Sequence, residues 1–107
     1  MTKRMVRYKL KADRVAENEH LVAAVYAALQ RAKPAGLRYA TFKLDDGLSF
    51  VHLVAYDSEA NRDSLVSLPA FKAFVAGVGE RCDEAPVTTD LQTVGSYGFF
   101  EAQGQHG

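Results

Sequence analysis

The chain has 107 residues, of which 48% are hydrophobic and 24% are charged. This size and composition fit one globular domain, and they exclude both a second domain of ordinary size and an intrinsically disordered chain. The 13 basic and 13 acidic side chains cancel, so the broad positive potential that attracts nucleic acids and anionic lipids is absent.

The sequence indicates a cytoplasmic protein. Residues 1–9 alternate between polar and apolar and lack the continuous apolar run of a signal peptide. The most apolar helical stretch, Leu21 to Leu29, has about half of the ~20 residues that span a bilayer, so we expect no membrane segment. The single cysteine, Cys82, excludes an intrachain disulfide and a cysteine metal cluster, and it fits a reducing cytosol.

A strand and a helix are predicted first. From Met5 to Lys11, apolar residues occupy every second position, the pattern of a strand with one solvated face. Asp13 is placed to cap a helix, and Pro34 and Gly36 are placed to end it. The apolar residues of this helix recur at helical spacing and are Leu21, Val22, Val25 and Leu29.

A β-hairpin is predicted next. The segment from Leu37 to Leu44 lacks helical periodicity, and Asp45-Asp46-Gly47 then supplies residues that tolerate positive φ in a tight turn. The second arm, Leu48 to Tyr56, is apolar at both odd and even positions. We therefore expect this strand to be covered on both faces.

The segment after the hairpin predicts two short helices or one kinked helix. Asp57-Ser58 interrupts the strand and offers a helix cap. The apolar residues that follow recur at mostly helical intervals, and Pro69 interrupts them.

A last strand is predicted from Val87 to Phe100, after a turn-rich segment that ends at Pro86. Gly95 and Gly98 within it indicate a bulge or a close backbone approach. We expect residues 1–102 to form the domain and residues 103–107 to form a flexible tail.

These elements predict a ferredoxin-like βαββαβ fold of the α+β class. Right-handed crossovers place the first and third strands in the middle of a four-stranded antiparallel sheet, with two helices on one face. Because the third strand is apolar on both sides, the other face needs a cover. A second copy of the chain can supply it, so we expect a homodimer joined through its sheet faces.

The segment from Tyr56 to Phe74 carries a family resemblance. Tyr56 ends the third strand, and an acidic-Ala pair, Glu59-Ala60, and then a Phe-Lys pair, Phe71-Lys72, follow it. In this order the segment resembles the antibiotic-biosynthesis-monooxygenase-like domains of the dimeric α+β barrel superfamily. The resemblance implies a dimeric α+β barrel, and activities that include cofactor-free oxidation of quinol-like or polycyclic aromatic substrates.

The chain also departs from this family at three positions. Members often have Trp where this chain has Tyr56, and His where it has Ser64. Val75 stands near the position at which a histidine of the haem-degrading members binds iron. The resemblance therefore does not extend to haem degradation.

Two residues are weak candidates for catalysis. His52 shares the parity of Phe50 and Tyr56 and could act as a general base facing an apolar pocket. The alternative, which we favour, is a core or interface histidine bonded to a neighbouring strand or to a partner chain. Tyr56 could orient a phenolic substrate, or it could simply reach water from the end of its strand.

A substrate pocket between the sheet and the helices is a further prediction from the aromatic residues. Aromatic residues at strand and helix spacings more often form plain core, and this alternative stays open. The candidate lining residues are Tyr8, Tyr39, Phe42, His52, Tyr56, Phe71 and Phe74.

No metal site and no tightly bound cofactor are predicted. The remaining histidines, His20 and His106, are far apart and have no carboxylate at ligand spacing. RNA binding is also not expected, although Gly47 to Leu53 partly matches the third strand of RNA-recognition domains. Asp46 stands where that motif has a basic residue, and the stacking aromatics are incomplete.

Two functions stay open at this point. One is a cofactor-independent monooxygenase that acts on an aromatic or quinol-like substrate. The other is a non-catalytic ligand-binding or accessory domain on the same fold.

Overall fold

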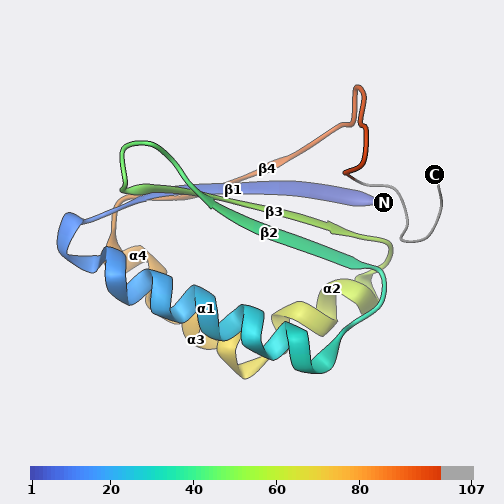
Figure 1. Cartoon of the computed structure of the whole chain (residues 1–107), viewed down its shortest axis with the longest axis horizontal. Coiled ribbons are helices and arrows are strands. Elements are labelled where there is room, and N and C mark those ends of the chain that lie inside the picture. The colour runs from blue at the N-terminus through green and yellow to red at the C-terminus, as the bar shows by residue number, and fades with distance from the viewer. Residues whose placement is uncertain (100–107) are drawn as a thin grey trace.

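The structure is a computed structural model and describes residues 1–99. An antiparallel sheet lies over a layer of helices, all on one face (Figure 1). The sheet has the strand order β2-β3-β1-β4, so the prediction that the first and third strands lie in the middle is confirmed. The strands are β1 (Thr2–Leu10), β2 (Leu37–Lys43), β3 (Ser49–Tyr56) and β4 (Cys82–Asp90). The helices are the 3-10 helix η1 (Ala12–Arg14), α1 (Val15–Ala32), α2 (Glu59–Val66), α3 (Pro69–Ala76) and α4 (Val78–Arg81).

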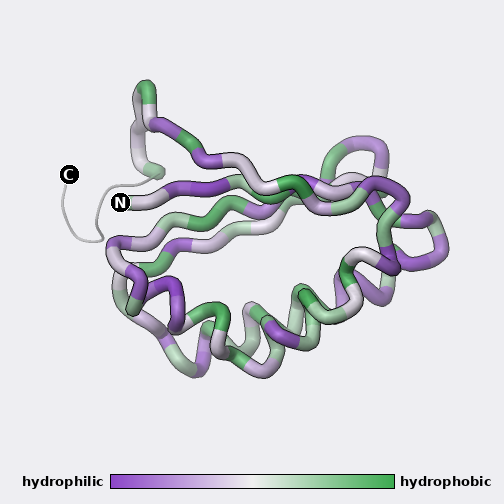
Figure 2. Tube along the Cα trace, turned by 180° about the vertical axis from the view of Figure 1, so that it is seen from behind, coloured by the Kyte–Doolittle hydropathy of each residue, from purple (hydrophilic) through white to green (hydrophobic). Residues whose placement is uncertain are grey.

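The alternation along the central strands separates the two faces of the sheet. Tyr8 pairs with Phe50, and Val6 pairs with His52, so the even-numbered residues of both strands face the helices. Polar and hydrophobic residues also alternate along the helices (Figure 2). The core forms between these layers and consists of Tyr8, Leu10, Val25, Phe50, Leu65 and Phe74.

Helix α1 packs on this core through the predicted apolar stripe. Val25 is buried, and the other residues of the stripe are half-buried against the core. The prediction that Asp13 caps this helix is wrong, because Asp13 lies in η1 and no side chain caps the start of α1. At the other end, Lys33 adopts the left-handed conformation at φ 46°, and its N–H donates to the carbonyl of Leu29.

The predicted hairpin turn is confirmed. Gly47 has a positive φ of 72°, which only glycine adopts readily. The carboxylate of Asp46 accepts hydrogen bonds from the backbone N–H groups of Leu48 and Ser49 and from the Ser49 hydroxyl. These bonds, chiefly those from Ser49, lower the pKa of Asp46 to about 2.

The break between the two predicted short helices is also confirmed. Ser58 caps α2, and its Oγ accepts from the N–H of Asn61 at 3.3 Å. Pro69 occupies the first turn of α3, where its missing N–H costs nothing. The short helix α4 then follows, which the sequence patterns did not predict.

The last strand differs from its prediction. β4 begins at Cys82 and ends at Asp90, whereas the predicted strand began at Val87 and ended at Phe100, which lies outside the described residues. β4 is an edge strand paired only with β1, and Pro86 lies at a shift in their register. Such a position tolerates proline because the ladder is already irregular there.

Gly95 and Gly98 follow β4 and make no bulge in it. The irregularity predicted for these two glycines occurs instead beside Pro86. Residues 103–107 lie outside the described part of the chain.

Candidate functional site

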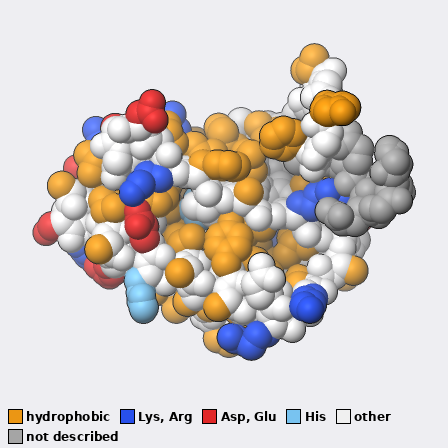
Figure 3. Space-filling view, in the orientation of Figure 1, with side chains coloured by type: hydrophobic (Ala, Val, Ile, Leu, Met, Phe, Trp, Pro, Cys, Tyr) orange, Lys and Arg blue, Asp and Glu red, His pale blue; other side chains and the backbone are white. Residues whose placement is uncertain are grey.

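A pocket of about 290 Å³ lies between the sheet and helices α2 and α3. We call it the sheet–helix pocket. Hydrophobic side chains gather where the sheet meets the helices (Figure 3). The pocket wall is mostly apolar, and its polar members are Arg4, Tyr39, His52, Tyr56, Arg62 and Thr88.

His52 is held by hydrogen bonds on both ring nitrogens. It is 3% exposed, because its position in the middle of β3 places it between the sheet and the helices. Its Nε2 lies 2.7 Å from the hydroxyl of Tyr8 on β1. Its Nδ1 lies 2.8 Å from the hydroxyl of Tyr39 and 3.0 Å from that of Thr41, both on β2.

The partners of Tyr8 determine where the proton of His52 sits. Arg81 donates from Nε to Oδ1 of Asn18 at 3.1 Å, and because arginine can only donate, the amide of Asn18 must turn its Nδ2 toward Tyr8. That Nδ2 donates to the hydroxyl oxygen of Tyr8 at 3.0 Å. Tyr8 can then give its own proton to His52 Nε2, which leaves the neutral ring with its proton on Nδ1.

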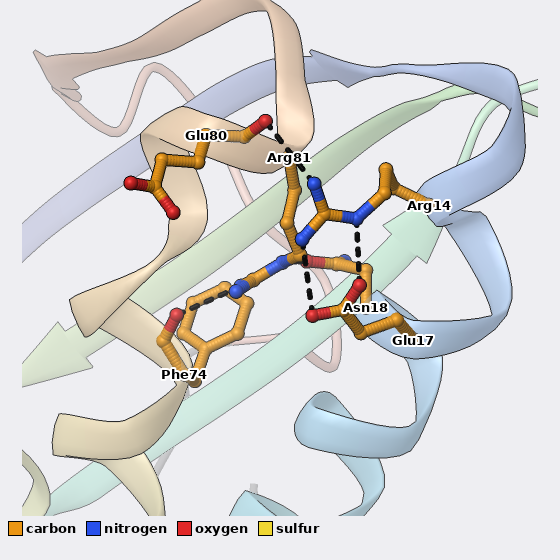
Figure 4. Close-up of polar contacts among 6 residues, drawn as sticks. All are labelled: Arg14, Glu17, Asn18, Phe74, Glu80 and Arg81. Atoms are coloured by element: carbon orange, nitrogen blue, oxygen red, sulfur yellow. Dashed lines mark hydrogen bonds and ion pairs between the residues drawn. The ribbon is translucent and has the colours of Figure 1, made fainter.

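Arg81 anchors this chain of hydrogen bonds at the end of α4. It is 2% exposed, and its Nη2 donates to the carbonyl of Phe74 at 2.8 Å (Figure 4). Its guanidinium carbon lies 5.4 Å from the centre of the Phe74 ring. Within residues 1–99 it forms no ion pair, so an amide, a carbonyl and a ring face hold its charge.

A separate surface cluster lies beside Arg81. Arg14 forms an ion pair with Glu17, with Nε 2.7 Å from Oε1, and it also contacts the carbonyl of Glu80 (Figure 4). This pair lowers the pKa of Glu17 and raises that of Arg14, chiefly through their hydrogen bond. The cluster joins the start of α1 to α4.

Burial keeps the central residues of the site uncharged. It lowers the pKa of His52 to about 4, so the ring is neutral at pH 7. It raises the pKa of Tyr8 to about 12 and also raises that of Tyr39. Because both nitrogens of His52 are bonded inside the protein, the arrangement favours the interpretation of His52 as a core histidine over that of a base for substrate.

Tyr56 carries a buried hydroxyl that lacks a hydrogen bond within the described residues. The residue is 2% exposed, and its hydroxyl has no hydrogen-bond partner among residues 1–99. The guanidinium carbon of Arg4 lies 5.9 Å from the centre of its ring. A buried hydroxyl of this kind costs free energy until a ligand or water supplies a partner.

The structure places the seven predicted pocket residues in three locations. Five of them line the sheet–helix pocket, namely Tyr39, His52, Tyr56, Phe71 and Phe74. Tyr8 is buried behind His52 and does not line the pocket. The prediction that Phe42 lines this pocket is wrong. Phe42 pairs with Val51 and is 49% exposed on the opposite face of the sheet, where it lines a different groove.

Sequence reasoning missed several residues of the site, among them Arg4, Asn18, Arg62 and Arg81. Arg4 carried a usable signal, because it lies in phase with Val6 and Tyr8 on β1. Asn18 and Arg81 carried none, since 63 positions separate them in the sequence. His20 is exposed on α1.

Among residues 1–99, no group of three or more His, Cys, Asp or Glu side chains could hold a metal ion. No helix in the same part of the chain is long and apolar enough to cross a membrane.

Comparisons with known proteins find similarity in structure only. No family model matches the chain, and no curated protein matches its sequence. A crystal structure of an antibiotic biosynthesis monooxygenase aligns with a TM-score of 0.73 at 17% identity, covering 89% of this chain and 100% of the other. Rv0793 from Mycobacterium tuberculosis aligns with a TM-score of 0.72 at 21% identity, covering 89% and 96%.

A third similar structure is that of a point mutant of SnoaB, a cofactor-independent oxygenase from Streptomyces nogalater. It aligns with a TM-score of 0.67 at 14% identity, covering 92% of this chain and 97% of the other. At these identities the likeness concerns the fold. The chain therefore has the ferredoxin-like fold of antibiotic-biosynthesis-monooxygenase-like proteins, as its sequence had indicated.

Proposed function

We propose that this protein is a cofactor-independent monooxygenase that binds an aromatic or quinol-like substrate in the sheet–helix pocket. The observation that carries the proposal is Tyr56, which lines a mostly apolar pocket and whose buried hydroxyl has no partner among residues 1–99. The fold shared with SnoaB, a cofactor-independent oxygenase, supports it.

The pocket residues fit such a substrate by shape and polarity. The rings of Phe71, Phe74 and His52 offer aromatic surface to a flat ligand. The hydroxyl of Tyr56 would hydrogen-bond a phenolic oxygen at one end and so orient the ligand. The enclosing helices α2 and α3 would exclude water from the reactive intermediate.

The electrons of this reaction come from the substrate itself. A methylene group of a quinol-like ring system reacts with dioxygen, so that one oxygen atom becomes a carbonyl oxygen and the other leaves as water. Two C–H bonds and the O–O bond break, and the methylene carbon gains a double bond to oxygen. The neutral His52 network keeps this part of the pocket wall uncharged and fixed in position.

The experiment is an oxygen-uptake assay with a panel of quinol-like and polycyclic phenolic compounds whose ring system carries a methylene group. Turnover of one panel member that falls in a Tyr56→Phe variant supports the proposal, since this change removes only the hydroxyl. His20→Gln, at an exposed position on α1, is the matched control. A panel that binds without oxygen consumption would exclude the oxygenase.

That outcome would favour the second candidate, a non-catalytic ligand-binding domain. The observation in its favour is that both ring nitrogens of His52 are occupied inside the protein, so His52 is no ready proton acceptor. Ligand binding with no oxygen uptake in any variant is its expected result.

We further propose that the chain works as a homodimer joined through the sheet face opposite the helices. That face carries exposed apolar side chains, including Phe42 at 49% and Val87 at 63% exposure. A groove of about 350 Å³ lies on it, between Phe42 and Ala55. Covering these side chains with a second copy removes apolar surface from water.

Light scattering at micromolar concentration tests the dimer. A mass of twice 11.7 kDa is expected for the natural chain. Phe42→Glu should shift the protein to monomer, whereas Phe42→Leu, which keeps an apolar side chain, should not. A monomeric natural chain would exclude the dimer.

A further inference from the structure

Two cationic side chains line the sheet–helix pocket. Arg4 from β1 and Arg62 from α2 line it, as Tyr56 does, and no aspartate or glutamate is among the described residues that line the pocket. The part of the pocket where the Arg4 guanidinium lies 5.9 Å from the centre of the Tyr56 ring is called the corner below. We propose that the pocket selects aromatic ligands that carry an anionic oxygen, which binds between the Tyr56 hydroxyl and the two guanidinium groups. The inference rests on the proposed function because it concerns the same pocket, but ligand binding can be measured without any turnover.

Tyr56 supplies a directed donor for such an oxygen. Its hydroxyl is buried and has no hydrogen-bond partner among the described residues, so its O–H is available to a ligand. An anionic oxygen accepts this O–H in a charge-assisted bond, which is shorter and stronger than a neutral one. A purely apolar ligand would leave the same hydroxyl unsatisfied.

Arg4 has donors left for a ligand. Its Nε donates to Asp90 at 2.8 Å, and its two terminal amino groups have no hydrogen-bond partner among residues 1–99. The guanidinium lies against the Tyr56 ring, 5.9 Å from its centre, so both residues address the same corner. The planar fork of an arginine matches a carboxylate in geometry.

Arg62 approaches from the opposite layer. Its side chain makes no hydrogen bond within residues 1–99, and its nearest ion-pair partner, Asp63, lies 3.9 Å away. The side chains of Asp63 and Asp90 are 67% and 78% exposed, so water and salt screen them from the pocket. Arg4 and Arg62 are 37% and 41% exposed, so solvent screens their charges less than those of Asp63 and Asp90. A third carboxylate, Glu59, also interacts electrostatically with Arg4 but does not line the pocket.

The rest of the pocket offers no competing charge. His52 is neutral at pH 7, and Phe71 and Phe74 are apolar. An aromatic ligand would lie against these rings with its anionic substituent pointing to the corner. The two parts of the pocket thus recognise the two parts of one molecule.

Binding of two matched probes tests the inference. 2-Naphthoate carries a carboxylate at neutral pH, and 2-naphthamide has the same shape without the charge. Titration calorimetry without oxygen measures both affinities in the absence of any turnover. We expect 2-naphthoate to bind about tenfold more tightly, with a preference that weakens as salt is added.

A second pair of measurements distinguishes a carboxylate from an ionised hydroxyl. A nitronaphthol is titrated below and above the pH at which its hydroxyl ionises, while His52 stays neutral because its pKa is about 4. Tighter binding of the ionised form shows that the corner accepts a phenolate. If only 2-naphthoate shows the preference, the ligand class narrows to carboxylates.

Three variants locate the preference in the corner. Arg62→Gln, Arg4→Gln and Tyr56→Phe should each weaken 2-naphthoate binding about tenfold and leave 2-naphthamide binding nearly unchanged. Arg31→Gln, at an exposed position of α1 outside the pocket, is the control and should change neither. Arg4→Gln removes the ion pair with Asp90 and so could prevent folding. In that case Arg62→Gln still tests the inference, because the Arg62 side chain makes no hydrogen bond within the described residues.

Several results would overturn the inference. These are equal binding of the two naphthyl probes, no binding of 2-naphthoate, or a preference that survives in Arg62→Gln and Tyr56→Phe. The outcome is separate from that of the proposed function. An anion preference without oxygen uptake supports the inference and excludes the oxygenase. Turnover of uncharged substrates without an anion preference supports the oxygenase and excludes the inference.

Discussion

His52 should make the stability of this fold depend on pH between about 6.5 and about 4. Burial lowers its pKa from 6.5 to about 4 in the folded chain, so the unfolded chain takes up a proton in this range and the folded chain does not. The stability linked to His52 is therefore complete above pH 6.5 and is lost as the pH falls toward 4. Since a tenfold change in proton affinity is worth about 1.4 kcal/mol, the loss amounts to about 3 kcal/mol.

The titratable side chains that contact His52 do not change their charge in this pH range. The titratable side chains that face His52 are Tyr8 and Tyr39, and burial raises the pKa of both, so they stay neutral. Asp46 has a pKa lowered from 3.8 to about 2, so its contribution is present above 3.8 and is lost only at lower pH. The losses of stability linked to His52 and to Asp46 should therefore appear as separate steps as the pH falls.

The assay is urea denaturation of the natural chain and of a His52→Gln variant at one fixed protein concentration, since oligomers make stability depend on concentration. Glutamine keeps hydrogen-bonding groups but does not titrate, so the variant should lack the loss of stability that His52 causes between about pH 6.5 and about pH 4. The loss linked to Glu17, whose pKa is lowered by Arg14, should begin near pH 4.5 in both proteins. NMR titration of the His52 ring checks the pKa directly. Parallel curves for the two proteins, or a ring that titrates near 6.5, would refute the reasoning.

Three further changes test local parts of the structure by denaturation. Arg81→Met should cost about 2–6 kcal/mol, because it leaves the Oδ1 of Asn18 and a backbone carbonyl buried without a donor, at about 1–3 kcal/mol each, and a loss below about 1 kcal/mol would contradict this. Gly36→Ala should destabilise more than Gly47→Ala: both glycines have φ near 70°, but a Cβ at Gly36 would lie 2.7 Å from the Asn61 side chain, whereas Gly47 faces open space. Equal losses would show that this contact is harmless. Ser58→Ala should cost about 1 kcal/mol by removing the cap of α2, and an unchanged midpoint would argue that the cap contributes nothing.

Elements whose signals are local or periodic could be predicted from the sequence. The alternation in β1, the apolar stripe of α1 and the turn at Asp45-Asp46-Gly47 each depend on neighbouring residues, and each is present in the structure. The family resemblance from Tyr56 to Phe74 also led to the correct fold. The end of the last strand was missed, because the pairing with β1 decides where β4 stops.

Tertiary structure alone decided the composition of the site. Tyr39 and Phe42 have opposite parity on β2, so they lie on opposite faces of the sheet, but only the packing of the helices shows which of the two faces the pocket. The chain of hydrogen bonds from Arg81 through Asn18 and Tyr8 to His52 joins four elements of the fold. No sequence pattern links residues so far apart, because their meeting depends on how α1 and α4 pack against the sheet.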